Sequence, residues 1–264
     1  MRLLAEHVLN MNKFELIINH IQEISKEKEY EFFSGLKKLK NNIPIQYITN
    51  HQEFMKLDFY VDENVLIPQP DTEVLVEEVI KYVERNSEKF SNTLPVKILD
   101  LCTGSGAIAI SLAKYIDNCE VIATDISSKA IQIAKLNAEK NLVHEKITFI
   151  ESDMFNSIPE TKFDIIVSNP PYIESAVIPT LSREVQKEPI IALDGGKDGL
   201  DFYKNIIDNL TKYSKSNSLL FLEIGYNQKD KLFNLIKTTI PSSNPKCIQD
   251  LANNDRVIIL ELNY

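Results

Sequence analysis

The spacing of hydrophobic residues changes twice along this 264-residue chain. Over residues 3–40 apolar side chains recur every three to four positions among Lys and Glu, which predicts two or three short helices. Residues 41–44 (Asn-Asn-Ile-Pro) interrupt this pattern, and over residues 46–62 apolar and polar positions alternate as they do in strands. We therefore expect a helical domain over residues 1–42 and a β-hairpin linker over residues 43–70.

Residues 71–264 have the pattern of an α/β domain. Apolar strands separated by helices are typical of a mostly parallel sheet that is covered on both faces. The last two strands follow one another without a helix, so they predict an antiparallel hairpin at one edge. We also expect Asp71 or Thr72 to cap the first helix of this domain. The predicted strands are 96–101, 120–124, 147–151, 163–168, 218–224, 246–250 and 256–262, and the predicted helices between them are 107–116, 128–140, 200–214 and 228–239.

Composition excludes several classes of function. The chain has 38 acidic and 29 basic residues and a formal net charge of −9, which opposes attraction to a phosphate backbone. No apolar run approaches the roughly 20 residues that span a bilayer, and the N-terminus lacks the pattern of a signal peptide. We expect a cytoplasmic protein without a membrane partner or direct contact with nucleic acid. Its three cysteines and four histidines are scattered, so we expect no metal site.

The candidate chemistry begins where the first strand of this domain enters a glycine-containing turn. Only seven glycines occur in the chain, so Gly104 and Gly106 in one turn indicate backbone that comes close to a ligand. The next strand ends at Asp125, a position suited to receive the hydroxyls of a ribose. The third strand ends near Asp153 and Met154, where an adenine can rest. The candidate cofactor-binding residues are Asp100, Cys102, Thr103, Gly104, Ser105, Gly106, Asp125, Asp153, Met154 and Asn169.

Two kinds of cofactor fit this turn. Gly104, Gly106 and Ala109 satisfy the dinucleotide fingerprint, so a nicotinamide-dependent dehydrogenase remains open. Asp100 stands just before the turn, where a carboxylate suits a cationic ligand better than a pyrophosphate. S-adenosyl-L-methionine carries an ammonium group, a sulfonium, a ribose and an adenine but no phosphate. It is therefore the favoured cofactor, with S-adenosyl-L-homocysteine as the product.

The tetrapeptide Asn169-Pro170-Pro171-Tyr172 ends the fourth strand. Prolines have no backbone N–H, so this loop offers carbonyl oxygens and the Asn side chain as hydrogen-bond acceptors. A primary amide or an exocyclic amine has two N–H groups to donate, and Tyr172 can cover its planar group. An ordinary turn is the alternative, because Asn-Pro dipeptides often begin turns. Beside a methyl donor, the loop predicts methylation of an amino or amide nitrogen, with Asn169, Pro170 and Tyr172 as catalytic residues and all four residues as substrate-binding.

Nearly the whole chain resembles the HemK family of class I methyltransferases, which modify the side-chain nitrogen of glutamine in peptide chain release factors. The Asn-Pro-Pro-Tyr motif alone is shared with DNA adenine methyltransferases, whereas the Pro70-Asp71-Thr72-Glu73 segment favours a release factor over a ribosomal protein. Besides the two loops above, the resemblance rests on residues 66–73 (LIPQPDTE), Glu188-Pro189, 195–200 (GGKDGL), Glu223-Ile224-Gly225 with Gln228, and Asp255-Arg256-Val257.

This resemblance implies a Rossmann-like class I methyltransferase with a seven-stranded sheet and a small N-terminal helical domain that grips the release factor. It also implies a monomer that methylates N5 of the glutamine in a Gly-Gly-Gln motif. The chain departs from the family at Gln69, where Arg is usual, at Cys102, where Gly is usual, and at Ala252-Asn253, where two glycines are usual. Its helical domain is also shorter than is typical.

Three other functions remain as alternatives. A DNA adenine methyltransferase requires a basic face and a target-recognition domain, and the sequence indicates neither. A ribosomal-protein glutamine methyltransferase and a non-catalytic adaptor that binds a translation factor are the others. We assign Phe202, Tyr203 and Phe221 to the hydrophobic core rather than to the cofactor site.

Overall fold

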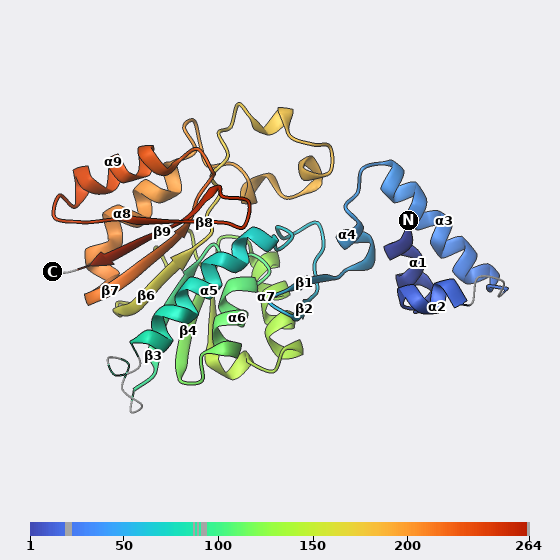
Figure 1. Ribbon diagram of the computed structural model, residues 1–264, viewed down its shortest axis with the longest axis horizontal. Coiled ribbons are helices and arrows are strands. Elements are labelled where there is room, and N and C mark those ends of the chain that lie inside the picture. The colour runs from blue at the N-terminus through green and yellow to red at the C-terminus, as the bar shows by residue number, and fades with distance from the viewer. Residues whose placement is uncertain (19–22, 87, 89, 91–93, 263–264) are drawn as a thin grey trace.

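The computed structural model describes residues 1–18, 23–86, 88, 90 and 94–262. Figure 1 shows two parts, a small group of N-terminal helices and a larger α/β domain, joined by the segment that carries a hairpin. The N-terminal part contains α1 (Arg2–Leu9), α2 (Lys13–Ile18) and α3 (Lys26–Lys40). Ser25 caps α3 by accepting the Lys28 N–H, which satisfies one free donor at the helix start. The predicted short helices are confirmed.

The linker is only partly the predicted hairpin. β1 (Gln52–Phe54) pairs antiparallel with β2 (Leu57–Phe59) as expected. Residues Ile45–Thr49, however, form helix α4, so the strand-like interpretation of the alternation before β1 is wrong. The helix ends at Asn50, which adopts the left-handed conformation with φ 51°. It is held by its packing, since the buried Tyr47 hydroxyl donates to the Val65 carbonyl at 2.6 Å.

The larger domain has the predicted seven-stranded sheet, in the order β5-β4-β3-β6-β7-β9-β8. The first five strands in this order are parallel, and β9 runs antiparallel to both β7 and β8. The edge hairpin is therefore confirmed. The elements are α5 (Pro70–Arg85), β3 (Val96–Leu101), α6 (Ala107–Tyr115), β4 (Cys119–Asp125), α7 (Ser128–Lys140), β5 (Ile147–Glu151), β6 (Phe163–Ser168), α8 (Asp201–Tyr213), β7 (Ser214–Glu223), α9 (Lys229–Thr239), β8 (Lys246–Gln249) and β9 (Asp255–Leu262).

Two hydrophobic layers enclose this sheet. Helices α5, α6 and α7 cover one face, and α8 and α9 cover the other (Figure 1). Residues of the central strand β3 alternate between the two layers, with Ile98 in the first and Leu99 and Leu101 in the second. Because both faces are apolar, the buried Asp100 in this strand is an exception that requires a structural reason.

The prediction that Asp71 or Thr72 caps α5 is wrong. The helix begins at Pro70, and no side chain of Asp71 or Thr72 caps it. Pro suits the first helical turn because its missing N–H would have no partner there. Thr72 is instead buried and accepts a hydrogen bond from Asn169.

A long connection between β6 and α8 folds over the carboxyl edge of the sheet. It contains the short 3-10 helices η2 (Ile178–Thr180), η3 (Val185–Lys187) and η4 (Ile190–Ala192). The buried Glu188 accepts the Ile67 N–H at 2.9 Å, which ties this connection to the linker. A two-residue parallel bridge also joins Ile173 to Asp194. These bonds hold the connection over the strand ends.

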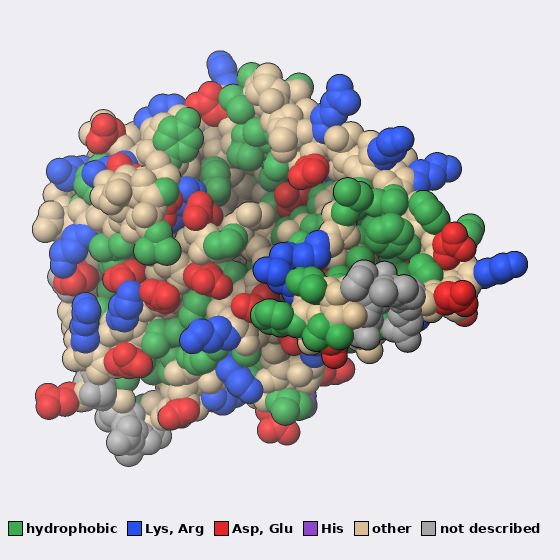
Figure 2. Space-filling model, turned by 45° about the vertical axis from the view of Figure 1, so that its right-hand side comes forward, with side chains coloured by type: hydrophobic (Ala, Val, Ile, Leu, Met, Phe, Trp, Pro, Cys, Tyr) green, Lys and Arg blue, Asp and Glu red, His purple; other side chains and the backbone are tan. Residues whose placement is uncertain are grey.

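The face of the molecule shown in Figure 2 does not have the charge distribution of a nucleic-acid-binding face. On the face in Figure 2, Lys and Arg side chains are interspersed with Asp and Glu rather than gathered in one patch. Exposed hydrophobic side chains of the N-terminal part include Phe14, Tyr30 and Phe33. No helix in the described ranges is long and apolar enough to cross a membrane.

Candidate active site

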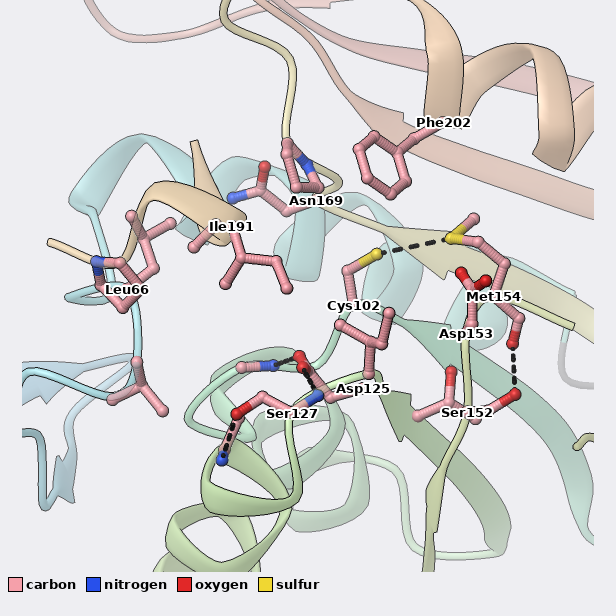
Figure 3. Close-up of a pocket in the computed structure, with 18 of the residues that line it drawn as sticks. Leu66, Cys102, Asp125, Ser127, Ser152, Asp153, Met154, Asn169, Ile191 and Phe202 are labelled. Carbon is pink, nitrogen blue, oxygen red and sulfur yellow. Dashed lines mark hydrogen bonds between the residues drawn. The ribbon is translucent and has the colours of Figure 1, made fainter. Parts of the chain in front are cut away.

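A single pocket brings together the two loops that the sequence singled out. It is a solvent-open cavity at the carboxyl ends of β3, β4, β5 and β6, with about 800 Å³ of empty space that includes solvent at its mouth. Strand order reverses between β3 and β6, and such positions are where ligands bind in open α/β sheets. The pocket is lined by Asn64, Val65, Leu66, Cys102, Gly104, Thr124, Asp125, Ile126, Ser127, Ala130, Ser152, Asp153, Met154, Asn169, Pro171, Pro189, Ile191, Ala192 and Phe202 (Figure 3).

The glycine turn after β3 is left-handed at three positions. Cys102, Gly104 and Gly106 have φ values of 61°, 55° and 84°. A Cβ added to Gly106 would lie 2.8 Å from Ile110 Cδ1 and 3.1 Å from Ala134 Cβ, so this glycine allows close packing of α6 against α7. A Cβ added to Gly104 would meet nothing within 4 Å, because this glycine faces the pocket. Glycine is therefore needed at position 106 for helix packing, and at position 104 it leaves space in the pocket.

Asp100 holds the turn together from below. Its Oδ2 accepts hydrogen bonds from Thr103 Oγ1 at 2.6 Å and from the Ala109 N–H at 3.2 Å. Its Oδ1 is buried without a partner among the described residues. Burial raises the pKa of Asp100 to about 7, although these two hydrogen bonds oppose the shift. Asp100 does not line the pocket, and neither do Thr103, Ser105 and Gly106.

Asp125 lies on the pocket wall, at the end of β4. Its Oδ2 accepts the Gly104 N–H and its Oδ1 accepts the Ser127 N–H, both at 2.9 Å. Burial raises the pKa of this carboxyl, and the backbone hydrogen bonds partly offset the effect. A carboxylate has about four acceptor positions, so both oxygens retain capacity for the hydroxyls of a ligand.

The charge of the wall distinguishes the two possible cofactors. Asp125 and Asp153 line the pocket, and no Lys, Arg or His is among the described lining residues. The Gly104 N–H, which a dinucleotide pyrophosphate would need, already donates to Asp125. The pocket therefore suits a ligand that carries positive charge and disfavours a phosphate. Within the described ranges, no three His, Cys, Asp or Glu side chains form a group that could hold a metal ion.

The Asn169–Tyr172 loop reaches the opposite wall of the pocket. Asn169 Nδ2 donates to Thr72 Oγ1 at 3.3 Å, whereas Asn169 Oδ1 has no partner among the described residues. Pro171 lines the pocket, but Pro170 is buried and Tyr172 is half-buried behind the wall. Burial, and then the carboxylate of Glu223, raise the pKa of Tyr172 above its usual range.

Gln228 and the second glycine cluster hold this loop from behind. Gln228 Nε2 donates to the Tyr172 carbonyl at 3.0 Å and to the Gly199 carbonyl at 3.1 Å, and its Oε1 accepts the Gly225 N–H at 2.9 Å. A Cβ added to Gly195 would lie 2.7 Å from Tyr172 Cα and 2.8 Å from the Pro171 carbonyl oxygen. The absence of side chains here lets two backbone segments pack directly against each other.

Sequence reasoning missed several residues of the pocket. Phe202 lines the pocket and also packs, partly buried, against the second hydrophobic layer, so its assignment to the core was incomplete, whereas Tyr203 and Phe221 are buried as predicted. Ile126 also lines the pocket and is 49% exposed. An apolar residue directly after the strand-end Asp125 was the sequence signal for this lining position. No sequence signal marked Leu66 or Ile191 as pocket residues, because both lie in segments far along the chain from the strand ends that form the pocket.

The family of the chain follows from comparison with known proteins. The family model described as PrmC N-terminal domain matches residues 1–49, and the model described as Methyltransferase small domain matches residues 81–188. A release factor glutamine methyltransferase of Clostridium acetobutylicum is 40% identical over 261 residues, which is 98% of this chain and 89% of that protein. One of Moorella thermoacetica is 37% identical over 262 residues, 98% of this chain and 90% of that protein.

Solved structures show the same fold at low sequence identity. A methyltransferase from Pyrococcus furiosus superposes with a TM-score of 0.55 and 18% identity, covering 91% of this chain and 100% of that one. The ribosomal protein L11 methylase from Lactobacillus delbrueckii subsp. bulgaricus gives 0.53 and 19%, covering 77% and 84%. The release factor glutamine methyltransferases named above are 37–40% identical to the chain over nearly its full length, and the pocket lies in a methyltransferase fold. The chain therefore belongs to the release factor glutamine methyltransferase family.

Proposed function

We propose that this protein transfers a methyl group from S-adenosyl-L-methionine to the N5 nitrogen of the glutamine in the Gly-Gly-Gln motif of a peptide chain release factor. The single observation that carries the proposal is the pocket itself. One of its walls contains the glycine turn after β3 together with Asp125, which we call the donor turn because it would hold the methyl donor. The opposite wall contains the loop that begins at Asn169, which we call the acceptor loop. Proteins named release factor glutamine methyltransferase are 37–40% identical to the chain over 261–262 aligned residues.

The residues of the donor wall fit S-adenosyl-L-methionine. Asp125 would receive the ribose hydroxyls, while Ile126, Met154 and Phe202 offer apolar surface for the adenine. Gly104 leaves the space that a bound ligand requires, because a Cβ there would meet nothing. Asp100 does not line the pocket, so it would act on the cofactor through the turn that it holds rather than by direct contact. When bound, the cofactor supplies an electrophilic methyl group on a positively charged sulfur.

The acceptor loop fits a carboxamide. Asn169 Oδ1 would accept one amide hydrogen of the glutamine. Pro170 is buried and does not line the pocket, so only its backbone carbonyl could accept the other, and the two bonds would aim the nitrogen at the methyl group. The cofactor would supply the methyl group to the nitrogen held in this way, and the proton that the nitrogen loses would leave to solvent. A glutamine side-chain nitrogen is a weak nucleophile, because its lone pair is delocalised into the carbonyl. The same resonance gives the peptide bond its rotation barrier of about 18–20 kcal/mol. Orientation of the reactants can supply roughly 7–11 kcal/mol of the barrier.

Tyr172, which the sequence predicted to cover the substrate amide, is not among the residues that line the pocket. Its half-buried ring lies behind the pocket wall, in contact with the second hydrophobic layer. We assign it to supporting the loop from that side. The helical N-terminal domain, residues 1–42, would provide the contacts with the release factor, because it carries exposed apolar side chains outside the catalytic domain.

The test is methylation of a purified release factor by this protein with labelled S-adenosyl-L-methionine, followed by mass spectrometry of the modified residue. We expect label on the Gly-Gly-Gln glutamine. We expect Asn169→Ala to retain cofactor binding and lose at least about a hundredfold in kcat, whereas Asn205→Ala, an exposed change on α8, keeps full activity. Label found only on DNA or on a ribosomal protein in parallel reactions would refute the proposal.

A further inference from the structure

Two segments from outside the sheet form one side of the pocket. The linker contributes residues 64–66, and the connection between β6 and α8 contributes Pro189, Ile191 and Ala192. Leu66 and Ile191 lie on the side of the pocket opposite Met154 (Figure 3). Neither segment is a strand of the seven-stranded sheet, so contacts other than a strand ladder must hold this wall in place.

A buried carboxylate joins the two segments. Glu188, which precedes Pro189, is 7% exposed, and Ile67, which follows Leu66, is 5% exposed. Glu188 Oε2 accepts the Ile67 N–H at 2.9 Å, although 121 positions separate the two residues along the chain. The bond therefore connects the segments one residue beyond the positions where each lines the pocket. An acidic side chain is costly to bury, so this residue requires a reason other than packing.

Each segment is also fixed within its own part of the fold. On the linker side, the buried Tyr47 hydroxyl on α4 donates to the carbonyl of Val65, a lining residue, at 2.6 Å. On the connection side, the Ala192 N–H donates to the Pro189 carbonyl at 2.9 Å and closes η4. The hydrogen bond of Glu188 thus links two supported pieces, and it sets the separation between them.

We propose that Glu188 is a positioning residue for the methyl donor, because its hydrogen bond to Ile67 holds the linker and the connection together as one wall and slows the departure of the bound donor. The proposal rests on the proposed function, since it takes S-adenosyl-L-methionine as the ligand of this pocket. Neither Glu188 nor Ile67 is among the described lining residues, so the carboxylate acts through the segments that it joins.

The test compares Glu188→Met and Glu188→Gln with the wild-type protein. Methionine is unbranched and flexible enough to fill a buried site, but its sulfur is a weak acceptor. Glutamine keeps a carbonyl oxygen for the Ile67 N–H. In stopped-flow measurements, we expect S-adenosyl-L-methionine to dissociate about tenfold faster from Glu188→Met, because a buried N–H loses its partner. Dissociation from Glu188→Gln should stay within about twofold of the wild-type rate.

The steady-state rates separate this role from a general loss of structure. In Glu188→Met, KM for the donor should rise, while kcat at saturating donor should fall by less than about threefold, since the acceptor loop keeps its own contacts. A fall in kcat with wild-type donor dissociation would overturn the proposal.

Glu73 offers a matched control on the same linker. Its Oε1 accepts the Met55 N–H at 2.6 Å, which ties α5 to the turn between β1 and β2. Neither residue is among the described residues that line the pocket. Glu73→Met removes the same kind of bond, and its donor dissociation rate should equal that of the wild-type protein. An equal acceleration in Glu73→Met and Glu188→Met would show that any loosening of the linker has this effect, which would overturn the specific role of Glu188.

Hydrogen exchange gives a measurement that needs neither turnover nor a variant. In the wild-type protein, saturating S-adenosyl-L-methionine should slow exchange of the Ile67 amide, because the bound donor keeps the wall closed. Unchanged exchange at Ile67 in the presence of bound donor would overturn the proposal. If the wild-type protein binds the donor but does not methylate a release factor, the proposed function fails, and the dissociation rates still decide the role of Glu188. If it binds no donor, both fail.

Discussion

Gly195 packs against the acceptor loop, so replacing it should change the rate of catalysis without changing the affinity for the cofactor. A Cβ at this position would lie 2.7 Å from Tyr172 Cα and 2.8 Å from the Pro171 carbonyl oxygen. Carbon atoms pack at about 3.5 Å or more, so in Gly195→Ala the loop must move by roughly 0.8 Å. Both atoms belong to the backbone and cannot rotate away, and Gln228 holds the same loop from another side.

Two quantities follow from this displacement. Overpacking in a buried site costs about 1–3 kcal/mol of stability, which lowers Tm by about 2–4 °C for each kcal/mol in a protein of this size. A misplacement of about 1 Å in a catalytic group can lower the rate by about a hundredfold. We therefore expect Gly195→Ala to lose roughly 10- to 100-fold in kcat while its affinity for S-adenosyl-L-methionine changes little, since Gly195 does not line the pocket.

Gly104→Ala is the matched comparison. It introduces the same methyl group at a residue with φ 55°, where a Cβ meets nothing within 4 Å. The left-handed conformation costs about 1–2 kcal/mol, so the two variants should melt at similar temperatures. Gly104→Ala should weaken donor binding and retain kcat at saturating donor. Isothermal titration and single-turnover methylation of folded protein measure both effects. If Gly195→Ala turned over at the wild-type rate, the idea that this contact positions the acceptor loop would be wrong.

Three further changes test other parts of the site. Cys102 has φ 61°, so Cys102→Gly should raise stability by up to about 1 kcal/mol in thermal unfolding, whereas Cys102→Ala, which keeps the strain, should not. Burial raises the pKa of Asp100 from 3.8 to about 7, so the free energy of unfolding falls as the pH rises through this range. Asp100→Asn removes the titrating group. Urea titrations of this variant should show a loss of unfolding free energy between pH 5 and 8 that is smaller by roughly 2–3 kcal/mol than in the wild-type protein. Phe202→Ala should weaken donor binding by about tenfold in calorimetry, and Phe202→Leu should weaken it less; equal affinities in all three proteins would remove Phe202 from the adenine surface.

The sequence by itself determined the layered α/β architecture. Hydrophobic periodicity reports local geometry directly, so the strands and helices from β3 onward lie close to their predicted positions, although β7 begins at Ser214 rather than at 218. Parallel strands also carry their carboxyl ends to one edge of the sheet, which is why Gly104, Asp125 and Asn169 could be expected to meet.

Local pattern was insufficient where packing decided the conformation. The alternation before β1 is equally compatible with a short helix, and the buried hydrogen bond of Tyr47 to Val65 selected α4. Thr72 had the sequence position of a helix cap, but its partner is Asn169, 97 residues away along the chain.

Only the tertiary structure decided which side chains face the ligand. It placed Asp100 beneath the donor turn, Tyr172 behind the wall and Phe202 on it. The physical reason is that burial and hydrogen-bond partners depend on contacts between segments far apart in sequence. A residue type and its local spacing specify what a side chain can donate or accept, and the assembled fold specifies what it meets.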